Sequence, residues 1–433
     1  MIATMTPIVE LDWLNQKRGS ARSRFEELGF PTVNNEDWRF TDVSPIARTV
    51  FAAASSAGRA ERFLTAGAGG PLLDASGADY FKAERLPGLP GFSSGLQLVF
   101  INGRYAPHLS QLTESDQACA GSLAAWLKND PDKIQPWLAR EGHASAFAAL
   151  NTAFFSDGAV VYLPKGAQPK EPIRLLFIST PSPEPTAVYP RILIVAESGA
   201  GAVVVEEYAG LDGSVCFNNV VAEIELGDNA GLEHYKIQRE SPAAFHVAST
   251  EVRQGRDSRY VSHSLSWGGS LTRNDVSVLL DAEGAGCSLN GLYMVSGTQL
   301  VDNHTKIDHA RPHTTSRELY KGVLDGRSRA VFNGTIIVRP NAQKISSVQA
   351  NRNLLLSEHC RVDTKPEFKI FANDVQCKHG ATIGQLSSEA IFYLRSRGIE
   401  EQEARRILVY AFMSEMVELI GLRPLRRALR HYV

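Results

Sequence analysis

The sequence predicts a mainly β protein, with a β-solenoid core set between helical regions at its two ends. Short β-branched runs fill residues 158–385, and no long helical period interrupts them. Glycine turns recur among these runs at Gly199, Gly227, Gly255 and Gly284, which lie 28, 28 and 29 residues apart. A fixed period filled by strands is typical of stacked solenoid turns, because each turn buries its apolar face on the next.

The repeat is incomplete, so it leaves a second architecture open. After Gly284 the phase slips, and the next similar turn is Asp325-Gly326, 42 residues further on. A β-sandwich with long hairpins is therefore the alternative to the solenoid.

The N-terminal region, residues 1–155, mixes helix and loop signals. Residues 7–30 have apolar positions at helical spacing. Residues 52–92 are rich in Ala, Gly, Ser and Pro, which indicates a loop or linker. A second helical stretch covers 117–155 and is broken at Asp130-Pro131. We therefore expect a mixed domain here, followed by the β core at 156–385 and a helical domain at 386–433.

The C-terminal domain is predicted to hold two helices. Ser387 or Ser388 can cap the first, which ends at Gly398. The second helix, about 403–420, has one apolar stripe, made of Ile407, Leu408, Ala411, Phe412, Met416, Leu419 and Ile420.

The end of the chain is basic. Arg423, Arg426, Arg427 and Arg430 surround Pro424. By composition these arginines form a solvated basic end, and the alternative is a docking surface for an acidic groove on a partner.

Composition narrows the class of protein. The 433 residues are 43% hydrophobic and 21% charged, which describes a soluble globular chain of two or three units. A net charge of −2 offers no basic field for nucleic acid. No apolar run is long enough for a membrane span, and the N-terminal sequence lacks the apolar core of a signal peptide. Five scattered cysteines indicate reduced thiols, so we expect a cytoplasmic protein.

Several catalytic and cofactor motifs are missing from the sequence. No Gly-Lys dipeptide occurs, so this chain has no P-loop and we expect no ATP site in it. There is also no C-x-x-C or H-E-x-x-H. The absence of C-x-x-C argues against a zinc ribbon and against a self-contained Cys-ligated cluster.

One polar cluster lies in VDNHTKIDHARPHT and contains Asp302, His304, Asp308, His309 and His313. Asp302 and His304 alternate, so they share one face of a strand, as two metal ligands would. The alternative is that these residues are hydrogen-bonding turn residues, which polar loops commonly contain.

A second cluster lies in NDVQCKHGATIG, where Cys377 and His379 fall on one face of a strand. A soft thiolate and an imidazole two residues apart can both reach one iron atom. They are only two ligands, so a stable site needs the others from another chain or from substrate. The alternative is that Cys377 is a small buried hydrophobe and His379 a hydrogen-bonded core residue.

The stretch from about 300 to 410 closely resembles the SufB/SufD family of iron–sulfur cluster assembly scaffolds. LVDNHTKIDHARPHTTSRELYKGVLDGRSRAVFNGTIIV and AQKISSVQANRNLLLSEHCRVDTKPEFKIFANDVQCKHGATIGQLSSEAIFYLRSRGI carry the resemblance, and NNEDWRFTDVSPI is similar to the N-terminal entry segment. The Cys377-x-His379-Gly380-Ala381-Thr382 motif and FYLRSRGI are similar to the SufD branch of this family. Residues 50–150 show little resemblance.

The resemblance implies a right-handed parallel β-helix in a complex of one SufB, one SufD and two SufC ATPase subunits. The β-helix would pair with that of SufB, and the C-terminal helical domain would dock SufC. The resemblance also implies a scaffold that is not an enzyme. His379 would lie at the SufB interface, where a nascent iron–sulfur cluster or iron is shared with a SufB cysteine, and Cys377 is the next candidate ligand. No metal role is carried onto His304, His309 or His313. A homodimer of the isolated chain is left open.

Two further functions compete with a cluster-assembly scaffold. One is a purely structural subunit, in which Cys377 and His379 belong to the core. The other is a β-helix enzyme that acts on polysaccharides, which would need clustered carboxylates in an exposed groove and usually a secretion signal.

Overall fold

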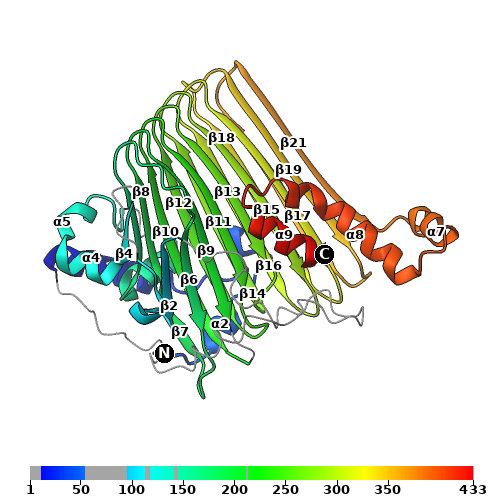
Figure 1. The fold of residues 1–433 in the computed structure, drawn as a ribbon, viewed down its shortest axis with the longest axis horizontal. Coiled ribbons are helices and arrows are strands. Elements are labelled where there is room, and N and C mark those ends of the chain that lie inside the picture. Colours follow the sequence, from blue (N-terminus) through cyan, green and yellow to red (C-terminus); the bar gives the residue numbers. More distant parts are fainter. Residues whose placement is uncertain (1–10, 54–94, 113–117, 141–144, 211–212, 433) are drawn as a thin grey trace.

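The computed structural model describes residues 11–53, 95–112, 118–140, 145–210 and 213–432. Most of the predicted linker at 52–92 lies outside these residues. Consecutive strands of the core alternate between two mainly parallel sheets, so each pair of strands forms one turn of a parallel β-solenoid of about eight turns (Figure 1). The predicted solenoid is confirmed, and the β-sandwich is excluded.

Sheet 1 contains most of the even-numbered strands. In chain order its strands are β1 (Ala52–Ala53), β4 (Cys119–Ser122), β5 (Gly158–Leu163), β7 (Thr186–Val188), β8 (Arg191–Ala196), β10 (Cys216–Leu226), β12 (Phe245–Gln254), β14 (Leu271–Leu280), β16 (Leu300–His309), β18 (Arg329–Val338) and β20 (Arg361–Ile370).

Sheet 2 contains the strands that alternate with them: β2 (Gln97–Ile101), β3 (Arg104–Tyr105), β6 (Ile173–Ser179), β9 (Gly201–Gly210), β11 (Gly231–Arg239), β13 (Arg259–Ser266), β15 (Gly286–Val295), β17 (Thr315–Leu324), β19 (Ile345–Leu355) and β21 (Val375–Gln385).

The turns of the solenoid stay in phase along its whole length. Neighbouring positions of sheet 2 are separated by 27 to 31 residues from β6 to β21. At the corner that leads from sheet 1 to sheet 2, one residue has a positive φ in every turn from β8–β9 to β18–β19, as tight turns often require: Gly199, Asn229, Asp257, Gly284, His313 and Lys344.

The predicted slip after Gly284 is therefore wrong. The next turn at this corner is 310–314, where His313 takes the left-handed conformation with φ 58°, and its backbone N–H donates to Gln343 O at 3.0 Å. Asp325-Gly326 lies at the opposite corner, between β17 and β18. His313 occupies a corner position where the earlier turns suggested glycine. The glycine spacing in the sequence therefore does not show that the solenoid period continues.

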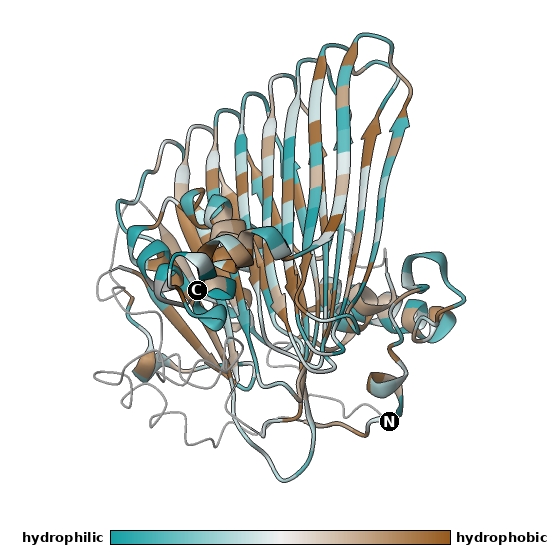
Figure 2. Cartoon of the chain, turned by 90° about the vertical axis from the view of Figure 1, so that its right-hand side faces the viewer, coloured by the Kyte–Doolittle hydropathy of each residue, from teal (hydrophilic) through white to brown (hydrophobic). Residues whose placement is uncertain are grey.

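Inward-facing side chains form ladders that run along the solenoid. One apolar ladder in sheet 1 joins equivalent positions of seven strands, ending on Phe368 of β20: Ile194, Ile224, Val252, Val278, Ile307, Ile336 and Phe368. The first six are buried in the central core. Along the later strands hydrophilic and hydrophobic residues alternate (Figure 2), as expected for strands with one face inside and one outside.

The N-terminal helices cover the outer face of sheet 1 at its beginning (Figure 1). Buried Leu14, Trp38 and Phe147 pack there against Leu193 and Phe217 of the sheet. The helices expected in 7–30 and 117–155 are present, with strand β4 among them: α1 (Asp12–Leu28), α4 (Leu123–Asn129), α5 (Pro131–Ile134) and α6 (Ala146–Phe154). Shorter elements are η1 (Glu36–Trp38), α2 (Ser44–Arg48) and η3 (Pro107–Leu109).

The C-terminal region contains α7 (Ser388–Ser396), α8 (Glu401–Glu418) and α9 (Arg423–Tyr432). The Ser387 hydroxyl accepts a hydrogen bond from Ala390 N at 3.2 Å, which confirms the predicted cap. α8 and α9 lie across the outer face of sheet 2, whereas α7 projects beyond β21 (Figure 1).

The predicted apolar stripe of the second C-terminal helix is partly wrong. α8 buries Ala404, Val409, Met413, Met416 and Val417. Predicted members Ile407, Ala411 and Leu419 are exposed instead. The helix has apolar residues on more than one face, so the sequence period alone does not decide which face meets the sheet.

The basic end of the chain is part of this packed unit. Arg426 Nε donates to Ile420 O at 2.8 Å, and Arg430 pairs with Glu418. Leu425 and Leu429 of α9 are buried among the residues that α8 packs against. The tail is therefore a docked helix with arginines on its outer side.

Candidate functional site

Cys377 and His379 lie on β21, the last strand of sheet 2. Cys377 pairs in register with Ser347, and His379 pairs with Gln349, both of which are buried inside the solenoid. The two side chains therefore share the inward face of β21, at the open end of the stack. Cys377 is half-buried and His379 is exposed.

The surroundings of the two side chains differ. The His379 ring packs against Phe368, with 4.4 Å between the ring centroids. Cys377 packs against the edge of the central core, and burial raises the pKa of its thiol. The thiol is thus protonated at neutral pH and would lose its proton on binding a metal.

The pair does not form a complete metal site. Among the described residues, no group of three or more His, Cys, Asp or Glu side chains is placed to hold a metal ion. A cluster or iron at Cys377 and His379 would therefore take further ligands from outside this part of the chain.

The open end is also an edge in both sheets. Within the described chain, β20 pairs with β18 alone and β21 pairs with β19 alone. The outer sides of β20 and β21 thus have backbone groups free for another strand. Exposed Phe371 and Ile383 lie on this last turn.

The structure separates the polar cluster of 302–313. Asp302 and His304 share the outer face of sheet 1, as predicted, with 3.0 Å between Asp302 Oδ1 and His304 Nε2. His309 is buried on the inner face, where its ring nitrogens lie 2.7 and 2.9 Å from the Thr314 and Ser316 hydroxyls. His313 occupies the corner turn. These residues have separate structural roles.

Asp302 belongs to a buried charge network that the sequence did not reveal. Arg273 Nη1 donates to Asp302 Oδ2 at 2.7 Å and to the Asp37 carbonyl at 2.6 Å. The Arg273 guanidinium also lies 3.9 Å from the centroid of the Trp38 ring. Burial raises the pKa of Asp302, but Arg273 and His304 lower it by more, to about 2. This network fastens the NNEDWRFTD segment to sheet 1.

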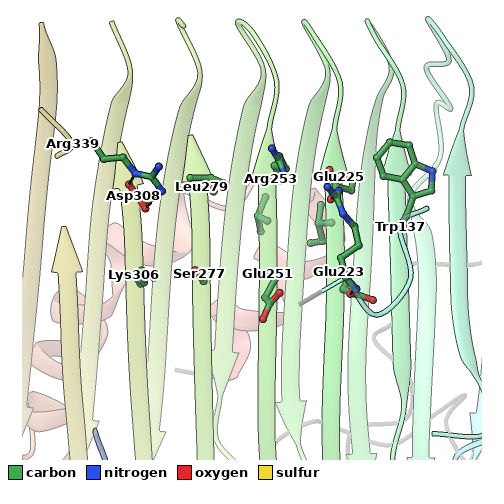
Figure 3. A pocket seen from close by; sticks show the side chains of 13 residues that line it. Trp137, Glu223, Glu225, Glu251, Arg253, Ser277, Leu279, Lys306, Asp308 and Arg339 are labelled. Carbon is green, nitrogen blue, oxygen red and sulfur yellow. Dashed lines mark hydrogen bonds and ion pairs between the residues drawn. The ribbon is translucent and has the colours of Figure 1, made fainter. Parts of the chain in front are cut away.

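Carboxylates gather in a depression on the outer face of sheet 1, with a volume of about 170 Å³ (Figure 3). Ten labelled residues line it: Trp137, Glu223, Glu225, Glu251, Arg253, Ser277, Leu279, Lys306, Asp308 and Arg339. Asp308 pairs with Arg339 at 2.8 Å, Glu225 pairs with Arg140, and Glu223 accepts from Ala139 N at 2.9 Å. Glu223 and Glu225 thus hold residues 139 and 140 on the sheet, and Asp308 holds Arg339. These structural pairings do not support the polysaccharide-active enzyme.

Helix α8 contacts β19, the neighbour of β21, and β17, the next strand of the sheet. Lys321 of β17 donates to the Phe412 carbonyl of α8 at 2.8 Å. Glu415 of α8 forms ion pairs with Lys321 at 2.6 Å and with Arg352 of β19 at 3.1 Å. On α7, Phe392 and Tyr393 are 75% and 57% exposed, which makes this helix an apolar surface.

None of the described helices is both long and apolar enough to span a bilayer.

Two family models match the chain. The model of the "SUF system FeS cluster assembly, SufBD core domain" matches residues 177–412, and the "SufBD protein N-terminal region" matches 81–175. The similarity therefore extends well beyond the stretch 300–410 and includes much of the region in which the sequence alone showed little resemblance.

Whole-chain relatives agree with these models. An iron–sulfur cluster assembly SufBD family protein of Synechocystis sp. is 34% identical over 97% of this chain and 90% of its own. The iron–sulfur cluster assembly protein SufD of Escherichia coli is 31% identical over 90% of this chain and 86% of its own. Protein ABCI7, chloroplastic, of Arabidopsis thaliana is 29% identical over 97% and 85%.

A two-sheet solenoid with an open last turn and helices at both ends defines a protein of the parallel β-solenoid class. The chain belongs to the SufBD family and is a component of the SUF system for iron–sulfur cluster assembly. Members of this family are non-catalytic assembly components.

Proposed function

We propose that this chain is a SufD-type scaffold subunit, which pairs with a SufB-type scaffold and a SufC-type ATPase and helps to form nascent clusters at the shared interface. The observation that carries this proposal is the place of Cys377 and His379, side by side on the inward face of β21, the last strand of sheet 2, which pairs only with β19 in the described part of the chain. Two ligands at an open edge suit a cluster that a second chain completes. The SufD of Escherichia coli, a relative named as an assembly protein, supports the choice of branch.

The scaffold partner would pair with the free edges of β20 and β21. Strand addition to an open sheet edge satisfies the backbone groups there and buries exposed apolar side chains such as Phe371. In this arrangement His379 and Cys377 face a ligand of the partner, and the cluster or iron is cargo shared between two chains. A homodimer of the isolated chain would use the same edges.

The ATPase would dock on the C-terminal domain, residues 386–433, through the exposed Phe392 and Tyr393 of α7. Movement of these helices would reach the site by a short route, because Glu415 of α8 is paired with Arg352 on β19, the neighbour of β21, and with Lys321 on β17, the next strand of the sheet. The rest of the chain would divide into an N-terminal domain, residues 1–155, and the solenoid, residues 156–385. We place the protein in the cytoplasm, although the Arabidopsis relative is named chloroplastic.

The test is co-purification of the tagged chain with SufB-type and SufC-type partners, followed by anaerobic reconstitution with ferrous iron and sulfide. His379→Ala should keep the complex intact and lose most of the cluster absorbance. His359→Ala removes another exposed histidine, in the turn between β19 and β20, and should behave as wild type.

Two outcomes would contradict the proposal. If the complex forms clusters equally well without both His379 and Cys377, the chain is a structural subunit. If His379→Ala abolishes the complex itself, the residue holds the interface together and its ligand role is not supported.

A further inference from the structure

We propose that Glu318 and Gln349 are positioning residues for His379: Gln349, held by Glu318, accepts a hydrogen bond from one ring N–H of His379 and leaves the other ring nitrogen free to act as a ligand. The ligand role rests on the proposed function, whereas the orientation of the imidazole does not.

The three residues form one inward-facing column of sheet 2. Glu318 of β17 pairs in register with Gln349 of β19, and Gln349 pairs with His379 of β21. Neighbouring strands lie about 4.8 Å apart, so side chains in such a column are in reach of each other. Glu318 and Gln349 are each 1% exposed.

The Gln349 amide is fixed at one end and unpaired at the other. Its Nε2 donates to Glu318 Oε2 at 2.7 Å. It also lies close against Gly334 of the facing strand β18, where a Cβ would come within 2.2 Å of the same nitrogen. Gln349 Oε1 is buried without a hydrogen-bond partner among the described residues. Buried acceptors normally have a partner, and His379 is the next polar group of the column.

The other side of the imidazole is limited by Phe368, whose ring centroid is 4.4 Å away. Phe368 ends the apolar ladder of sheet 1, so it provides a fixed wall for the ring. Rotation of the exposed imidazole along this wall can bring a ring N–H to Gln349 Oε1. A histidine that acts as a metal ligand commonly donates its other N–H to an oxygen acceptor, which fixes its tautomer.

The charge on Glu318 determines which end of the amide faces His379. An ionised carboxylate accepts only, so Gln349 must offer its NH₂ group to Glu318 and its oxygen to His379. The groups that face Glu318 are Thr305 of β16, Cys287 of β15, Tyr320 of its own strand and Gln349. Burial raises the pKa of Glu318, and hydrogen bonds with Thr305 and Gln349 offset part of this rise, so that the resulting pKa is about 7. Glu318 therefore ionises in the neutral range.

The experiment measures the tautomer of His379 in the full chain without metal, from the ring nitrogen shifts of ¹⁵N-histidine at pH 8. His379→Ala identifies the signals. Gln349→Met keeps the size of the side chain and removes the acceptor, so the ratio of the two tautomers should change about threefold to tenfold, the range for one net hydrogen bond. Glu318→Gln, which keeps a partner for Gln349 but removes the charge, should shift the ratio in the same direction.

Gln238→Met is the matched control. Gln238 is also fully buried, and its Nε2 donates to a buried glutamate, Glu240, at 2.8 Å, but it lies on β11, far along the stack from His379. This variant should leave the His379 tautomers unchanged. A Gln349→Met spectrum with the wild-type ratio, in a chain that keeps its circular dichroism, overturns the proposal. A change of equal size in Gln238→Met also overturns it, because the effect would then be a general loosening of the solenoid.

The result is separable from the cluster role of His379. If His379→Ala supports normal cluster formation while Gln349→Met shifts the tautomers, the positioning holds and the ligand role fails. If the tautomers do not respond, the positioning fails whatever the cluster assay gives.

Discussion

Replacement of Glu318 by glutamine should stabilise the protein at alkaline pH and have little effect at acidic pH. Glu318 is buried inside the solenoid, where Gln349 Nε2 donates a hydrogen bond to its Oε2 at 2.7 Å. Burial without a cationic partner disfavours the ionised form and raises the pKa from its ordinary value of 4.5 to about 7. Glutamine can accept the same hydrogen bond from Gln349 and has no charge to bury.

The sign and size follow from the two pKa values. Because the folded-state pKa is above the unfolded one, the folded protein binds more protons between pH 4.5 and 7, and its stability falls as the pH rises through this window. The cost of ionising buried Glu318 reaches about 3 kcal/mol at pH 8 and is under about 1 kcal/mol at pH 5. Glu318→Gln should recover this difference.

The assay is urea unfolding of the wild-type chain and of the Glu318→Gln variant, each at pH 5 and pH 8, with circular dichroism as the measure of unfolding. The matched control is Glu240→Gln. Burial raises the pKa of Glu240, but His246 and its hydrogen-bond partners lower it by more, so this substitution should destabilise the protein at pH 8. A stability difference between Glu318→Gln and wild type that is the same at both pH values would refute the reasoning, since Glu318 would then titrate as an ordinary carboxyl.

Two further predictions concern the two ends of the chain. Arg273→Ala removes the partner of buried Asp302 and should lower the free energy of unfolding by about 3–5 kcal/mol. Amide hydrogen exchange should rise first at residues 37–41. Unchanged exchange there would contradict the proposed fastening of the N-terminal segment. Phe392→Asp should preserve the fold, because the side chain is 75% exposed, but should lose the ATPase in co-purification. Phe371→Asp, at the open end, should retain the ATPase and weaken scaffold pairing; loss of the ATPase in both variants would argue against docking on α7.

Local pattern was sufficient for the class of fold and for part of the site. β-branched runs with turns at near-constant spacing predict a solenoid, because every turn repeats the same local sequence of strand and corner. Side-chain alternation in a strand also predicts that Cys377 and His379 share a face, and the register agrees. The motif around them indicated the family that the comparisons show.

The tertiary structure decided whether the face shared by Cys377 and His379 points into or out of the solenoid, and which side chains lie behind His379. Glu318 and Gln349 precede His379 by 61 and 30 residues, and nothing near either residue marks it as a neighbour of the site. Their proximity comes from the register of β17, β19 and β21. Register depends on the length of every intervening turn, so a change of one residue would place other side chains beside His379.

The same distinction explains an alternative that the sequence left open and a prediction that was wrong. The 302–313 cluster looked continuous in sequence, but Asp302 faces out beneath the N-terminal segment, His309 faces in, and His313 forms a corner. The buried face of α8 depended on which of its apolar residues met sheet 2. Strand period and turn preference are properties of adjacent residues, so the sequence alone determined the solenoid and its family. Burial, charge pairing and the column behind His379 arise from contacts between successive turns, and only the folded structure establishes those contacts.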